Sequence, residues 1–140
     1  MMKVSLQRIN QRYKLEAKND TDRSIIFDNT VSGGGNDEGF RPMQSLLAAA
    51  GACSSIDVIS ILNKQKYEAF DLSVCVEGER DSGKDANLWT KVHLHFTITG
   101  DIPKEKAQRA VELSVTKYCS VSKTLEAAGA VVTASVEVLN

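Results

Sequence analysis

The first 27 residues alternate between hydrophobic and polar side chains, and a period of two is typical of half-buried β-strands. The predicted strands span residues 4–9, 13–17 and 24–27. Asn19-Asp20 lies between the last two strands and favours a hairpin turn there. Residues 32–39 are glycine-rich and have no hydrophobic period, which predicts a flexible loop.

A long apolar helix is predicted next. Pro42 suits the first turn of a helix, and hydrophobic residues then recur every three or four positions to about Lys66. The first three turns are apolar or small around nearly the whole circumference, so we expect this helix to be packed on several sides, at the centre of the assembly. Gly51, Asp57 and several serines interrupt its apolar stretch, which favours a buried helix over a membrane span.

The remainder of the chain predicts strands, then helices, then a last strand. We expect strands at residues 70–79 and 88–99, helices at 103–118 and 120–128, and a closing strand at 131–139. The first two form a hairpin through a polar turn at residues 81–85, and Gly129 ends the second helix. No strand-helix-strand repeat is evident, so the order predicts a single α+β domain over residues 1–140 with a mostly antiparallel sheet.

Composition and charge narrow the class of partners. The 140 residues are 42% hydrophobic, which is enough for one core, and 17 basic residues nearly balance 18 acidic ones. A chain without a strong net charge is not steered towards nucleic acid or an anionic membrane. The N-terminal residues lack the apolar block of a signal peptide, so we expect a cytoplasmic protein.

Three cysteines are the candidate reactive groups. Cys53, Cys75 and Cys119 form neither an even disulfide framework nor a C-x-x-C metal motif, so in the cytoplasm they should be thiols. Cys53 lies among small residues that leave room for another group, and Cys119 lies near the start of a helix, whose dipole favours a thiolate. Free cysteines are also common as small buried hydrophobic residues, and the residues alone leave that alternative open. Cys75, in the middle of a strand, is interpreted as a bystander.

Two other patterns were weighed as ligand sites. His93 and His95 share one face of a strand and could bind zinc or iron, but no third ligand is evident, and an exposed strand face explains the pair more simply. The glycine-rich loop at residues 32–39 lacks the strand and helix context of a phosphate-binding motif, and its acidic run at 36–38 suits a solvated loop. We therefore predict no metal and no cofactor.

Two segments carry a family resemblance. RPMQSLLAAAGACSSIDVISIL, residues 41–62, and KYCSVSKTLEAAGAVV, residues 117–132, resemble the two cysteine motifs of the OsmC/Ohr family, in the same order and at about the same separation. The resemblance implies sheets packed around a long central helix and an intertwined homodimer. It also implies that Cys53 is the peroxidatic thiolate and that Cys119 resolves the sulfenic acid to a disulfide, which a thiol reductant reopens.

One position departs from the family pattern. Peroxidases of the family usually carry a glutamate after the proline that holds an arginine against the thiolate, and here Met43 stands there, followed by uncharged Gln44. Neither Arg23 nor Arg41 lies in a motif that would identify the arginine. The chain is therefore similar to the family's less characterised branch, which lacks this acidic partner.

Two functions remain open from the sequence. The first is a thiol-dependent peroxidase that reduces hydroperoxides, organic ones in view of the apolar residues around Cys53, in defence against oxidative stress. The alternative is a non-catalytic redox sensor or small-ligand-binding member of the same family. The retained cysteine pair favours the first function, and Met43 favours the second.

Overall fold

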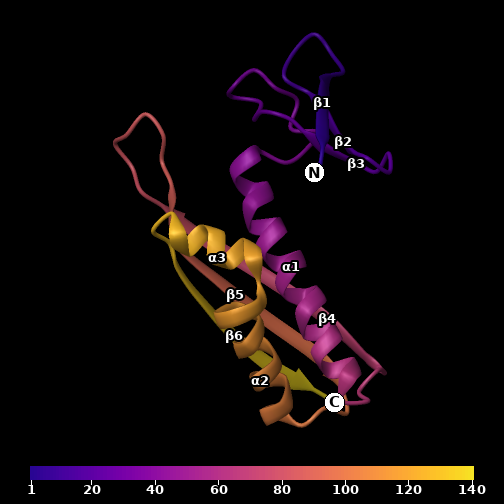
Figure 1. Cartoon of the computed structure of the whole chain (residues 1–140). Coiled ribbons are helices and arrows are strands. Elements are labelled where there is room, and N and C mark those ends of the chain that lie inside the picture. Colours follow the sequence, from indigo (N-terminus) through magenta and orange to yellow (C-terminus); the bar gives the residue numbers. More distant parts are fainter. The chain divides into compact units, whose positions relative to one another are not determined.

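The computed structural model describes all of residues 1–140 and divides the chain into two compact units, Met1–Ser45 and Leu46–Asn140 (Figure 1). The elements in chain order are β1 (Val4–Arg8), β2 (Leu15–Asn19), β3 (Ser24–Phe27), α1 (Pro42–Lys64), β4 (Phe70–Arg80), β5 (Trp89–Gly100), α2 (Lys104–Leu113), the π-helix η1 (Ser114–Tyr118), α3 (Ser120–Ala127) and β6 (Val131–Leu139). The predicted α+β class is confirmed. The boundary between the units falls within α1, and the expectation of a single domain stays a prediction.

The first unit is a three-stranded antiparallel sheet followed by an ordered loop. The strands lie in the order β1-β2-β3. The buried carboxylate of Asp28 accepts backbone N–H groups of Asn29, Asn36 and Glu38 at 2.8, 3.2 and 3.1 Å. Burial raises the pKa of Asp28, but these N–H groups outweigh it and hold the pKa below its usual value. The glycine-rich loop that was predicted to be flexible is therefore organised around one carboxylate.

The second unit contains the sheet β4-β5-β6. β4 and β5 form the predicted antiparallel hairpin, whereas β6 runs parallel to β5. Parallel neighbours require a crossover connection, and α2, η1 and α3 supply it. The sequence interpretation missed this strand-helix-strand unit because its helical segment is long and broken. Three of the four strand pairings in the chain are antiparallel, so the mostly antiparallel sheet is confirmed.

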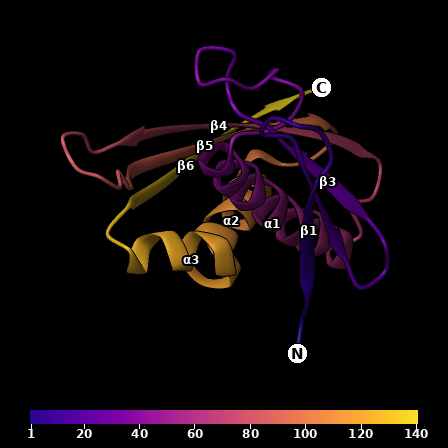
Figure 2. The ribbon, with the colours of Figure 1, turned by 90° about the horizontal axis from the view of Figure 1, so that it is seen from above.

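The core of this unit lies between one face of the sheet and the helices. Figures 1 and 2 show α1, α2 and α3 on the same side of β4-β5-β6. Leu94, Phe96 and Ile98 of β5 are fully buried, and they belong to the same core as Val58 and Leu62 of α1. Strand alternation turns the neighbouring positions of β5 towards the outer face, as the sequence pattern predicts.

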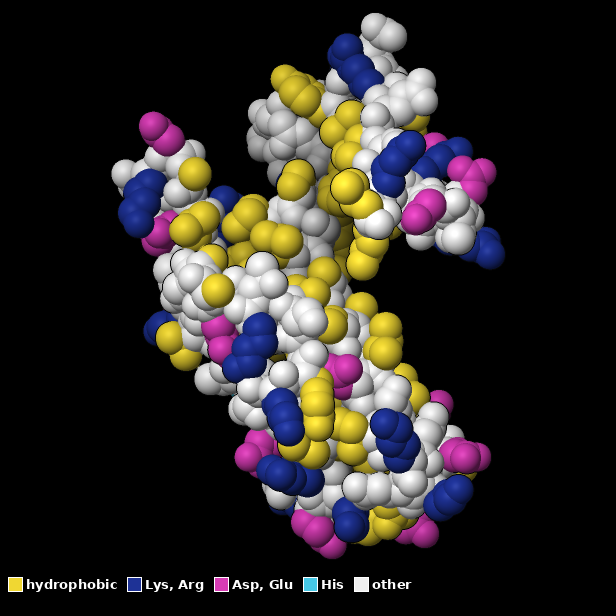
Figure 3. Space-filling view, viewed as in Figure 1, with side chains coloured by type: hydrophobic (Ala, Val, Ile, Leu, Met, Phe, Trp, Pro, Cys, Tyr) yellow, Lys and Arg dark blue, Asp and Glu magenta, His cyan; other side chains and the backbone are white.

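α1 lies close to the sheet along one face only. A Cβ atom at Gly51 would lie 3.0 Å from a methyl group of Val76, so a glycine there permits the close approach of α1 to β4. The rest of its surface carries exposed apolar residues, including Ile56 at 65% exposure, Leu46 at 39% and Ile59 at 38%. Hydrophobic side chains are visible along the helix in Figure 3. Within one chain α1 is therefore packed along one face, and the expectation that it is packed on several sides of an assembly stays a prediction.

The apolar character of α1 also corrects the membrane argument. By length and composition alone, α1 could cross a membrane, and the core helix of a soluble protein can pass the same test. The polar interruptions cited from the sequence are too few to exclude a span. The buried contacts of α1 with the sheet favour a core helix that presents a second apolar face.

The segment predicted as one helix from residue 103 to 118 is broken. α2 ends at Leu113, η1 follows as a π-helical turn, and the backbone N–H of Cys119 donates to the carbonyl of Ser114 at 2.7 Å. Cys119 then takes extended dihedral angles between η1 and α3. Single π-helical turns occur often at functional sites. α3 ends at Ala127, and Gly129, predicted as the helix stop, follows two residues later with a φ of 109° that favours glycine.

Candidate functional site

Two cysteines and a carboxylate converge in the second unit. The sulfurs of Cys53 and Cys119 and a carboxylate oxygen of Asp57 all lie within 4.8 Å of one another. Cys53 and Asp57 are one turn apart on α1, and Cys119 comes from the junction of η1 and α3. The structure thus brings together the two cysteines that the sequence selected. It adds an acidic residue that the sequence interpretation missed.

Cys119 is a buried thiol at the start of a helix. Its side chain is fully buried, its sulfur accepts the backbone N–H of Ser122 at 3.4 Å, and it lies 3.9 Å from the carbonyl oxygen of Ala50. Burial is the main cause that raises the pKa of Cys119, and the neighbouring Cys53 raises it further. The backbone N–H of Ser122, which donates to the sulfur, lowers the pKa but does not reverse the direction. Cys119 is therefore a protonated thiol at neutral pH.

Asp57 is held by two buried serines. The hydroxyl of Ser114 donates to the Asp57 carboxylate at 2.9 Å, and the hydroxyls of Ser54 and Ser114 are 2.8 Å apart. Since the one hydrogen of the Ser114 hydroxyl is directed at Asp57, Ser54 donates to Ser114. Both serines are fully buried. The signal that could have found Asp57 is its position four residues after Cys53, which places both side chains on one face of a helix.

The charge around the thiols is negative. No ion pair in the chain involves Asp57. The cluster thus comprises two cysteines and one acidic side chain, with no Lys, Arg or His of the chain paired to that acid. Within this chain, Cys53 therefore lies beside the opposite charge from the one that a fast thiol peroxidase uses.

The residues near the start of α1 have structural roles in the first unit. The side-chain oxygen of Gln44 accepts the backbone N–H of Arg41 at 3.2 Å, as the third residue of a capping box does. The guanidinium of Arg41 forms an ion pair with Asp37. Arg23 is exposed and forms no ion pair. Gln44 and Arg41 thus have partners that account for them without a role at the cysteines.

Cys75, His93 and His95 lie on the outer face of the second sheet. Cys75 is exposed on β4, away from the other two cysteines. The ring nitrogens of His93 lie 2.7 Å from the Thr133 hydroxyl and 2.9 Å from that of Ser135. His95 lies 2.6 Å from Ser135 and 3.4 Å from Glu137. Both imidazoles therefore have hydrogen-bond partners on β6. This agrees with the interpretation of the histidine pair as part of an exposed strand face.

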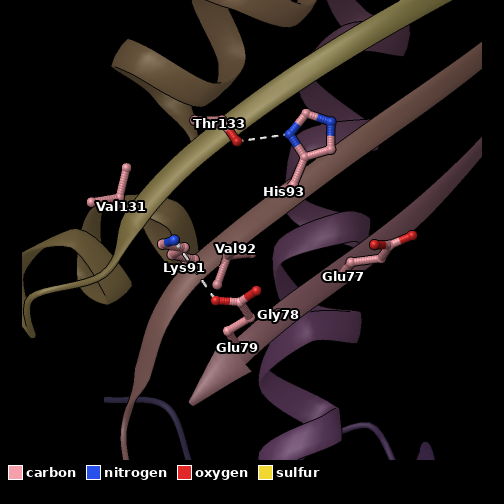
Figure 4. Close-up of a pocket in the computed structure, with 8 residues that line it drawn as sticks. All are labelled: Glu77, Gly78, Glu79, Lys91, Val92, His93, Val131 and Thr133. Atoms are coloured by element: carbon pink, nitrogen blue, oxygen red, sulfur yellow. Dashed lines mark hydrogen bonds and ion pairs between the residues drawn. The ribbon is translucent and has the colours of Figure 1, made fainter. Parts of the chain in front are cut away.

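A shallow hollow of about 300 Å³ lies on this outer face (Figure 4). Its lining residues are Glu77, Gly78, Glu79, Lys91, Val92, His93, Val131 and Thr133. Lys91 and Glu79, which are neighbours on the paired strands β5 and β4, form an ion pair at 3.8 Å and are highly exposed. The hollow is separate from the cysteines, and its polar groups are largely paired with one another, so the cysteine cluster is the stronger candidate site.

Comparison with known proteins decides the family. Residues 34–135 match the family described as OsmC-like protein. The chain belongs to the OsmC-like family. Protein YhfA of Escherichia coli strain K12 is 42% identical over 99 residues, which is 70% of this chain and 73% of YhfA. The resemblance stated from the two cysteine segments is confirmed, and both segments lie within the matched residues.

Solved OsmC-like structures share the fold over the whole chain. The OsmC-like protein from Mycoplasma pneumoniae has a TM-score of 0.82 at 16% identity, covering 100% of this chain and 98% of that one. An organic hydroperoxide resistance protein OsmC from Legionella pneumophila has a TM-score of 0.72 at 19% identity, covering 98% and 96%. At these identities the likeness establishes the fold, and the activity has to be argued from the site.

Proposed function

We propose that this OsmC-like protein is a thiol-dependent peroxidase that reduces hydroperoxides, organic ones in particular, with Cys53 as the attacking residue and Cys119 as the resolving residue. The observation that carries the proposal is the distance between the two sulfurs, which is no more than 4.8 Å. The organic hydroperoxide resistance protein from Legionella pneumophila, which shares the fold, agrees with this chemistry.

The reaction needs only the two cysteines and an external reductant. The Cys53 thiolate attacks the terminal oxygen of the hydroperoxide, the O–O bond breaks, and the alcohol leaves after taking up a proton. Cys119 then attacks the sulfur of the Cys53 sulfenic acid, and water departs as the disulfide forms. Two thiols and one hydroperoxide thus give one disulfide, one alcohol and one water, and a dithiol reductant restores the thiols by exchange.

The environment of Cys119 suits the second step. Because burial keeps Cys119 protonated, its proton can leave with the hydroxide of the sulfenic acid as water. Its burial also protects it from direct attack by peroxide, whereas Cys53 is half-buried and within reach of a small substrate. The difference in exposure therefore supports the proposal that Cys53 attacks and Cys119 resolves.

The electrostatics point to slow turnover. Asp57 lies beside the thiols, and Met43 stands where family peroxidases usually carry the acidic partner of an arginine. Neither feature places a cation beside Cys53 within one chain. They favour the second candidate function, a redox sensor in which the same disulfide forms but catalytic cycling is not the role.

We also propose that the protein is a homodimer in the reducing cytoplasm. The exposed apolar face of α1, with Ile56 and Ile59, is large for a solvated helix, and a second copy would cover it. A C₂ arrangement would place the same face of both helices in one interface.

Steady-state consumption of an organic hydroperoxide in the presence of a dithiol tests the proposed function. We expect consumption that depends on both protein and dithiol, with kcat below the typical enzyme value of about 10 s⁻¹. The Cys75→Ser protein should behave like the unmodified protein, because Cys75 lies on the far face of the sheet. Consumption no faster than in the protein-free control would reject the peroxidase and leave the sensor.

A further inference from the structure

We propose that the reduced protein binds one Zn²⁺ ion per chain between the sulfurs of Cys53 and Cys119 and the carboxylate of Asp57. This proposal does not depend on peroxidase activity, although the ion would bind the same two thiols. The inference rests on the arrangement of the three ligand atoms, the groups that surround them and their combined charge.

The three ligand atoms are already nearly at the spacing of a zinc site. Zn–S bonds of about 2.3 Å and Zn–O bonds of about 2.1 Å place neighbouring ligands of a tetrahedral ion roughly 3.5–3.8 Å apart. The sulfurs of Cys53 and Cys119 and the Asp57 oxygen all lie within 4.8 Å of one another. A movement of about 1 Å, which side-chain rotation can supply, would bring all three to an ion.

The groups around the ligands are those of an outer coordination shell. The carboxylate of Asp57 accepts a hydrogen bond from Ser114, which Ser54 supports in turn, and the sulfur of Cys119 accepts the backbone N–H of Ser122. Hydrogen bonds of this kind orient metal ligands and strengthen their binding. The hydroxyl of Ser122 is fully buried and has no hydrogen-bond partner. It lies beside the Cys119 sulfur, where a zinc-bound thiolate would accept its hydrogen.

The three ligands, two cysteine sulfurs and one carboxylate, favour zinc over harder ions. Two thiolates and one carboxylate suit a borderline-soft divalent ion, whereas Mg²⁺ and Ca²⁺ require oxygen ligands. No cation of this chain is paired with Asp57, and a divalent ion would offset the negative charge that three ionised ligands create. Cys53 and Asp57 are both partly exposed, so an ion can enter from solvent and a water molecule can occupy the fourth position.

Zinc binding and disulfide formation exclude one another. The zinc-bound thiolate pair, one hydroperoxide and two protons would give the Cys53 to Cys119 disulfide, an alcohol, water and free Zn²⁺. The two thiolates lose two electrons, and the O–O bond accepts them. Since a disulfide sulfur is a poor zinc ligand, the oxidised protein should not retain the ion.

Calorimetric titration of the full-length reduced protein with Zn²⁺, against a competing chelator, tests the proposal. We expect one ion per chain at micromolar protein concentration, and Asp57→Asn should weaken binding more than about tenfold. Asparagine preserves the size of the side chain, and a thermal melt of each variant verifies the fold. The disulfide form of the unmodified protein should bind no zinc. Titration of this form needs no substitution.

Two controls separate this site from the other candidate ligands. Cys75→Ser and the double variant His93→Asn/His95→Asn should both bind zinc like the unmodified protein, because these side chains lie on the outer face of the sheet. The proposal is overturned if the reduced protein binds no zinc, if Asp57→Asn binds it equally well, or if the double histidine variant loses it. The titration contains no peroxide, so a protein that fails as a peroxidase can still confirm the metal site.

Discussion

Replacing Cys53 by serine should abolish dithiol-dependent consumption of hydroperoxide, with a loss of more than about a hundredfold, because a serine hydroxyl does not form the nucleophile at neutral pH. The reason for choosing Cys53 is its exposure. Cys53 is the partly exposed member of the thiol pair, and its sulfur is the one that a substrate can reach. The measurement is the rate of peroxide loss in the presence of the dithiol.

The Cys119→Ser variant should behave differently from Cys53→Ser. It retains the attacking thiol, so it should consume about one equivalent of hydroperoxide and accumulate a sulfenic acid that a sulfenate-specific reagent can trap. Cys75→Ser serves as the matched control and should match the unmodified protein. If Cys53→Ser turned over at the unmodified rate, or if Cys119→Ser trapped no sulfenic acid, the roles would be wrong.

Introducing a charge on the exposed face of α1 should dissociate the proposed homodimer. Ile56 is 65% exposed in the single chain, and a second copy would bury it, so Ile56→Asp should place an unpaired carboxylate in an apolar interface. We expect the dimer dissociation constant to rise by roughly a hundredfold, which corresponds to about 3 kcal/mol. Sedimentation equilibrium of both proteins measures this change.

The control for this substitution is Leu88→Asp. Leu88 is also exposed, at 47%, but it lies in the connection between β4 and β5 rather than on α1. The Leu88→Asp substitution should leave the dimer dissociation constant unchanged. An unmodified protein that sediments as a monomer at micromolar concentration would contradict the proposed dimer, and an Ile56→Asp protein that remains dimeric would place the interface elsewhere.

Hydrophobic periodicity was sufficient to predict most of the fold. The alternation in β5 located both its core side chains and the outward-facing His93 and His95, because strand geometry leaves no other arrangement. The parallel pairing of β6 was not predictable in this way, since alternation does not reveal the direction of the neighbouring strand. The π-helical turn at Ser114 was missed for a similar reason, because the residues around it continue a helical pattern.

The candidate site was predicted in part. Cys53 and Cys119 were selected from two segments, but Asp57 was counted only as a polar interruption of an apolar helix. The role of Asp57 depends on the hydrogen bond that it accepts from Ser114, which lies 57 positions later in the chain. The sequence indicated that α1 has more apolar surface than one small domain covers, but the pattern does not show which of its faces packs on its own sheet.

The central claim, that Cys53 and Cys119 form one redox unit, is tested most directly by locating the disulfide. Reduced protein would be treated with one equivalent of an organic hydroperoxide, alkylated, and digested without reductant. Cleavage after lysine and arginine leaves the three cysteines on separate peptides, which mass spectrometry distinguishes. We predict a linked pair of peptides that contains Cys53 and Cys119, with Cys75 alkylated. A bridge from Cys75 to either cysteine, or three alkylated thiols after the peroxide is consumed, would contradict the account.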